Sequence, residues 1–152
     1  MATIEKSIDT LNELIEINND RVAGFEKAIA DIKDENVDLK EVFMEYAAQS
    51  RKFSQELTSI VAGEGGEADT SNTTSGTLHR AWIDVKSLFG GSDRASILSE
   101  AERGEDAIKK AYGDALAEGE LNGQAYEKVS VQALEIDSAH DRIKMLRDAA
   151  KN

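Results

Sequence analysis

The sequence predicts an all-α protein built as a bundle of four long helices, and three features support this. The chain contains no proline, so nothing in its composition forces a helix to break. Apolar residues recur at alternating spacings of three and four through four long segments, which is the pattern of helices with one buried stripe. At 152 residues the chain is long enough to bury one substantial core, so we assign residues 1–152 to a single domain.

The first two helices are expected over residues 4–34 and 36–62. Each has one polar interruption near the middle of its apolar stripe, Asn18 in the first and Ser50, beside Gln49, in the second. The join between them is very short, which predicts antiparallel neighbours. The two stripes consist of Ile8, Leu11, Ile15, Val22, Phe25, Ile29 and Ile32, and of Leu39, Phe43, Tyr46, Phe53, Leu57 and Ile60.

A long connection is expected from Gly63 to Gly91. It begins with the turn-forming run GEGGEADTSNTTSG and continues into a short amphipathic helix over residues 77–89, which carries Trp82. Such a connection is long enough to return along the whole bundle, so we predict an up-down-down-up order in which helices two and three are parallel. An up-down-up-down order is the alternative, but it leaves the length unexplained. The Trp82 helix can pack on the flank of the bundle or form a contact between subunits of a homo-oligomer.

The third and fourth helices are expected over residues 93–118 and 124–149. Their stripes again carry one strongly polar residue each, Glu105 in the third and His140 in the fourth. The apolar and mostly apolar members are Leu98, Ala101, Ile108, Tyr112 and Ala115, and Tyr126, Val129, Ala133, Ile136, Ile143 and Leu146.

Composition excludes several classes of function. The formal net charge of -12 disfavours nucleic acid and anionic membranes as direct partners. No apolar run approaches the ~20 residues of a membrane span, and the N-terminus lacks the apolar core of a signal peptide, so we expect a cytoplasmic protein. The chain has no cysteine and no nucleotide-binding fingerprint, which argues against thiolate metal sites and against a nucleotide ligand.

The four polar interruptions should share one layer of the bundle. Two uses of this layer compete. In the first, Glu105, Asp137 and His140 bind a metal ion such as Fe, Mn or Zn, because two carboxylates and one imidazole suit these ions. In the second, the layer is a buried hydrogen-bond network that fixes the helix register, and the residue types alone favour this use. The polar layer comprises Asn18, Gln49, Ser50 and Glu102 around Glu105 and His140, with Arg21 close to it.

The chain resembles the ferritin-like superfamily, and more closely a small bacterial ferritin-like four-helix-bundle family of unknown function. The resemblance lies in the segments LNELIEINNDRVAGFEKAI, FMEYAAQSRKFSQEL, GTLHRAWIDVK, AERGEDAIKKAYGDAL and AHDRIKMLRD. Di-iron members of the superfamily place Glu on the first and third helices and Glu-x-x-His on the second and fourth. On this chain the resemblance assigns those positions to Asn18, Glu105, Ser50 with Phe53, and Asp137 with His140, so half of the di-iron set is present.

These observations predict a binding or structural module, with stress or metal handling as its expected role, and favour it over an enzyme. The alternative is an iron- or manganese-dependent oxidoreductase, of ferroxidase type, that uses the reduced ligand set. The sequence establishes no cofactor, and the candidate that its residues suggest is an Fe, Mn or Zn ion.

Overall fold

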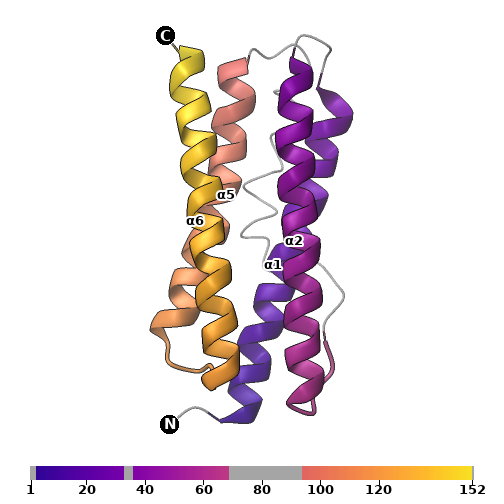
Figure 1. The fold of residues 1–152 in the computed structure, drawn as a ribbon, viewed down its shortest axis with the longest axis vertical. Helices are drawn as coiled ribbons and strands as arrows, with labels where there is room; N and C mark the ends of the chain where they lie inside the picture. Colours follow the sequence, from indigo (N-terminus) through magenta and orange to yellow (C-terminus); the bar gives the residue numbers. More distant parts are fainter. Residues whose placement is uncertain (1–2, 33–35, 69–93, 152) are drawn as a thin grey trace.

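The computed structural model describes residues 3–32, 36–68 and 94–151, which form four α-helices (Figure 1). The helices are α1 (Ile4–Asp31), α2 (Val37–Gly63), α5 (Arg94–Ala117) and α6 (Gly123–Lys151). The all-α prediction is confirmed for these ranges, which contain no strand. The predicted Trp82 helix, over residues 77–89, lies outside the described residues.

Local interactions define where the helices begin and end. The Thr3 side chain caps α1 by accepting a hydrogen bond of 3.2 Å from the backbone N–H of Lys6. Ile32 has extended backbone angles and ends this helix. After α2 the chain turns at Gly65, whose φ of 88° is favourable only for glycine and whose N–H donates to the carbonyl of Ala62.

Contacts between side chains give the direction of each helix. On α1 and α5, Asn18 meets Tyr112 and Arg21 meets Glu105, so the residue numbers rise in opposite directions and these helices are antiparallel. The same argument makes α2 antiparallel to α1, since Arg21 meets Ser50 and Asn19 meets Ser54, and it makes α6 antiparallel to both α2 and α5. Consequently α2 and α5 point the same way, as Figure 1 shows. α1 packs mainly on α2 and α5 mainly on α6, with smaller contacts joining α1 to α5 and α2 to α6.

The core has two apolar halves with polar side chains between them. One half lies towards the end of the bundle where α1 finishes and α2 begins, and it includes Phe25, Phe43 and Leu98. The other includes Leu11, Leu57, Ile108, Tyr112 and Val129. Burial of these side chains is the main force that holds the four helices together.

The first half of α6 is rotated relative to the prediction. Tyr126, which the sequence places on the buried stripe, is 46% exposed, whereas Ala125 is 1% exposed. Gln132 is fully buried in place of its neighbour Ala133. The predicted stripe through Tyr126 and Ala133 and the observed one through Ala125 and Gln132 both have spacings of three and four, so the periodicity of the sequence cannot distinguish them. Within the described ranges, no helix has the length and apolar character needed to cross a membrane.

Candidate metal centre

The polar layer is centred on a fully buried ion pair between α1 and α5. Arg21 donates from Nε and Nη2 to the two carboxylate oxygens of Glu105, each at 2.8 Å, and both side chains are 0% exposed. The remaining guanidinium nitrogen, Nη1, donates to Gln49 Oε1 at 2.7 Å and to Ser50 Oγ at 3.0 Å. The charge of Glu105 is therefore compensated by a bidentate partner, the strongest arrangement available to a buried carboxylate.

The hydrogen bonds of this layer continue to the other helices. Ser50 Oγ donates to Asn18 Oδ1, and Asn18 Nδ2 donates to the Tyr112 hydroxyl, both at 2.8 Å. The Tyr112 hydroxyl donates to Gln132 Oε1 at 2.7 Å, and Gln132 Nε2 donates to Glu56 at 3.1 Å. Burial raises the pKa of Tyr112, so its hydroxyl stays protonated and keeps donating.

The structure thus unites part of the predicted polar layer. Asn18, Gln49 and Ser50 are joined through Arg21 to Glu105. The contacts of Glu102 and His140 form a separate cluster. Asp137 is half-buried on α6. The metal set Glu105, Asp137 and His140 stays a prediction.

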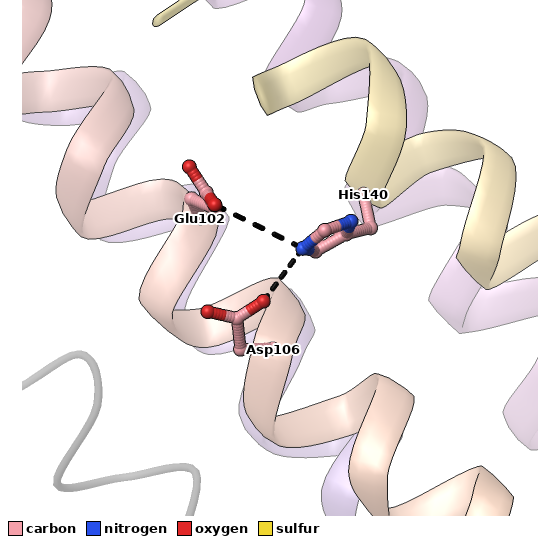
Figure 2. A group of neighbouring side chains, drawn as sticks. All are labelled: Glu102, Asp106 and His140. Carbon is pink, nitrogen blue, oxygen red and sulfur yellow. Dashed lines mark hydrogen bonds and ion pairs between the residues drawn. The ribbon is translucent and has the colours of Figure 1, made fainter. Parts of the chain in front are cut away.

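The second cluster lies between α5 and α6 (Figure 2). Glu102 and Asp106 are one turn apart on α5, and His140 faces them from α6. His140 Nε2 is 2.6 Å from Asp106 Oδ1 and 4.0 Å from Glu102 Oε1. Among the described residues, these three form the one group of His and acidic side chains whose ligand atoms all lie within 4.8 Å of one another.

The surroundings hold the imidazole of His140 in place. Its Nδ1 lies 3.1 Å from Asp141 Oδ1, and the His140 side chain is 10% exposed. If the neutral imidazole carries its proton on Nδ1 and donates a hydrogen bond to Asp141 Oδ1, then Nε2 presents a lone pair towards Asp106. Two acceptors 2.6 Å apart repel each other, so a proton or a cation must lie between them. A histidine oriented in this way by a carboxylate on its other nitrogen is typical of metal ligands.

The donor set fits a divalent transition ion. One imidazole nitrogen and two carboxylates suit Zn²⁺, Mn²⁺, Fe²⁺ or Co²⁺, whereas Mg²⁺ and Ca²⁺ prefer oxygen ligands alone. Ligand atoms around one such ion lie roughly 3.0–3.5 Å apart. The distances from His140 Nε2 to Asp106 and Glu102, 2.6 and 4.0 Å, fall on either side of this range, so small side-chain rotations would bring the three atoms around one ion.

Sequence reasoning missed two members of this environment. Asp106 lies off the apolar stripe and its side chain is 59% exposed, so a search for polar residues on buried faces passes over it. Arg147 contacts Glu102 from α6. The available signals were the spacing of four between Glu102 and Asp106 and the spacing of seven between His140 and Arg147, both of which place residues on one helix face.

Comparison with known families gives a match to the family model described as a domain of unknown function (DUF2383). It covers residues 6–118, which include all of α1 but its first two residues, and the whole of α2 and α5. No curated protein matches the chain.

Proposed function

The chain belongs to the DUF2383 family of domains of unknown function, and we propose that it is a ferritin-like bundle that binds one divalent transition metal ion. The ferritin-like assignment is supported by the helix directions: α1 and α2 are antiparallel, α5 and α6 are antiparallel, and α2 and α5 point the same way. This order is the one predicted from the length of the connection between the second and third long helices. A cytoplasmic location and a homo-oligomer formed through the Trp82 segment remain parts of the same proposal.

The residues do not fit a di-iron centre. Asn18, Ser50 and Phe53 occupy positions where the resemblance requires carboxylates and an imidazole. Both oxygens of Glu105 accept hydrogen bonds from Arg21, a permanent cation that supplies the positive charge an ion would bring. The polar layer is therefore better suited to fixing the helix register than to holding two metal ions.

The observation that carries the proposal is the convergence of Glu102, Asp106 and His140 on one point between α5 and α6. Three protein ligands leave further coordination positions for water or for a second molecule. Such a site suits reversible binding, and we propose metal handling as its role. An oxidoreductase would use the same ligands and is distinguished from a binding module by whether bound iron turns over.

Metal titration tests this proposal. The chain should be purified without a histidine tag, stripped with a chelator and titrated with Co²⁺, whose visible absorption reports nitrogen and oxygen ligands, and with Zn²⁺. We expect one equivalent to bind and Mg²⁺ at millimolar concentration not to compete. The variants His140→Ala and Asp106→Asn should each weaken binding at least about tenfold. His79→Ala, which removes the other histidine of the chain, is the matched control and should leave binding unchanged.

Two further results separate the remaining alternatives. If Asp137→Asn abolishes binding and Asp106→Asn does not, the ligand set predicted from the sequence is correct and the trio of Figure 2 is not the site. If Fe²⁺ binds and is oxidised by oxygen over repeated turnovers, faster than in buffer, the protein is an oxidoreductase. Less than about a tenth of an equivalent of any transition ion would refute metal binding altogether.

A further inference from the structure

Arg147 forms an ion pair with Glu102, the more deeply buried of the two carboxylates in the candidate metal centre. Glu102 turns Oε1 towards His140, and its Oε2 contacts the Arg147 guanidinium through Nη1. The Glu102 side chain is 11% exposed, so it has little access to water and depends on these neighbours for charge compensation. Arg147 lies seven residues after His140 on α6, which places both on the same face of that helix.

A second carboxylate also holds Arg147. Its Nε and Nη2 donate to Asp148 Oδ1 at 3.2 and 2.9 Å. The hydrogen bonds to Asp148 raise the pKa of the guanidinium, which is charged at any ordinary pH. Arg147 can therefore leave Glu102 and still keep an acidic partner, because two of its nitrogens remain on Asp148.

Charge balance makes the ion and the guanidinium competitors. A divalent ion with the two carboxylates of Glu102 and Asp106 and a neutral imidazole is a neutral group. If Arg147 stayed on Glu102, the same carboxylate would be shared by two cations in a largely buried place, which is unfavourable. Without an ion, Arg147 is the cation that compensates Glu102.

We propose that Arg147 determines the affinity of this site for a divalent ion. The ion must displace the Arg147 guanidinium from the Glu102 carboxylate, and Arg147 then remains paired with Asp148 alone. The inference relies on the proposed metal-binding function. It assigns to α6 both a ligand, His140, and the competitor that the ion displaces. Binding is then an exchange of one cation for another, and removing the competitor should tighten it.

The test compares three variants of α6 that each remove one positive charge. Arg147→Gln removes the competitor. Lys144→Gln and Arg142→Gln are matched controls, since Lys144 is exposed and Arg142 pairs with Glu45 and Tyr46 of α2. We expect Arg147→Gln to lower the Kd for Zn²⁺ about fivefold, as when a partly exposed ion pair no longer competes, and each control to change it less than twofold.

Asp148, the second partner of the Arg147 guanidinium, gives a prediction in which the Kd for Zn²⁺ changes in the opposite direction. Asp148→Asn should leave Arg147 more firmly on Glu102 and raise the Kd about two- to threefold. In the background of Arg147→Gln the same Asp148→Asn change should have no effect, because there is no guanidinium to hold. A general loss of negative charge near the site would instead weaken binding equally in both backgrounds, and that result would overturn the inference.

The outcomes for this inference and for the metal site itself are distinct. If neither the wild-type chain nor Arg147→Gln binds Zn²⁺ or Co²⁺, the proposed site is refuted. If the wild-type chain binds and Arg147→Gln binds no more tightly than Lys144→Gln, only the role of Arg147 is refuted. Binding by Arg147→Gln alone, or a shift of the Arg147 Nε–H resonance when Zn²⁺ is added to the wild-type chain, supports the displacement.

Discussion

Removing Glu105 should reveal how much the bundle depends on the buried ion pair. The variant Glu105→Gln keeps the size of the side chain but leaves Arg21 without a counter-ion in a place that is 0% exposed. Breaking a buried pair from one side costs about 3–5 kcal/mol, because the remaining charge is desolvated and uncompensated. Against a total of about 5–15 kcal/mol for a domain of ordinary stability, this is a large loss. Chemical denaturation followed by circular dichroism at 222 nm measures it.

Other interactions of Arg21 should reduce the stability that Glu105→Gln loses. The Arg21 guanidinium also donates to Gln49 and Ser50, and its carbon lies 5.4 Å from the ring centroids of Phe25 and Tyr46. Hydrogen bonds and aromatic faces stabilise a cation by about 0.5–2 kcal/mol each in partly desolvated sites. We therefore expect Glu105→Gln to fall near the lower end of the range, at about 3 kcal/mol.

A double variant distinguishes the effect of an unpaired buried charge from the effect of changing the side chains at these positions. Replacing both partners, as in Arg21→Met with Glu105→Leu, removes the desolvated charges together and should be less destabilising than Glu105→Gln alone. The matched control is Glu26→Gln, which breaks the exposed Arg51–Glu26 pair, about half exposed on each side, and should cost less than about 1 kcal/mol. If Glu105→Gln costs no more than Glu26→Gln, the pair does not organise the core and the reasoning is wrong.

The other predictions concern single contacts. Tyr112→Phe should cost about 1–3 kcal/mol, since Gln132 loses a donor in the core. Burial raises the pKa of Tyr112, so the wild-type chain keeps this stabilisation below the unfolded pKa of about 10 and loses it above; urea unfolding at pH 9 and 11 should show a steeper loss for wild type than for Tyr112→Phe. Gly66→Ala should cost about 1–2 kcal/mol, because an added Cβ would lie 2.8 Å from Ile8, and Ile8→Ala should relieve that strain. Gly63→Ala, with nothing within 4 Å, should change the melting temperature little.

The helices could be predicted from the sequence because a buried stripe is a local pattern. All six residues of the α5 stripe, from Leu98 to Ala115, are buried, and Glu105 lies at the predicted place among them. Helix α6 was harder, since the sets containing Gln132 or Ala133 have equivalent spacing. The choice is made by a contact far away in the sequence: Gln132 accepts the hydrogen bond of Tyr112 from α5, and Ala133 cannot.

The candidate site was only partly predictable, for a related reason. His140 and Glu102 were selected as polar residues of the layer, but the stripe pattern gives no information on the axial offset between α5 and α6. That offset brings His140 to Asp106. The Asp106 side chain is exposed, so the pattern of buried residues does not indicate that it contacts His140. Arg21 was noted only as a neighbour of the layer, because the predicted stripe of the first helix passes through Val22, whereas the structure leaves Val22 partly exposed and buries Arg21 completely.

The acidic residues of one helical turn of α5 have two different electrostatic environments. Glu105 points towards α1, where Arg21 belongs to the core and, among the described residues, has no other acidic side chain as a hydrogen-bond partner. Glu102, three residues earlier, points towards α6, where Arg147 is near the surface and already shares its guanidinium with Asp148. A cation that enters from solvent can therefore compete for Glu102 more readily than for Glu105, since among the described residues Arg147 has a second carboxylate partner, Asp148, whereas the other partners of Arg21 are the neutral side chains of Gln49 and Ser50. The pairing that makes the polar layer stable thus also explains why metal binding is expected at the seam of α5 and α6, away from the centre of the bundle.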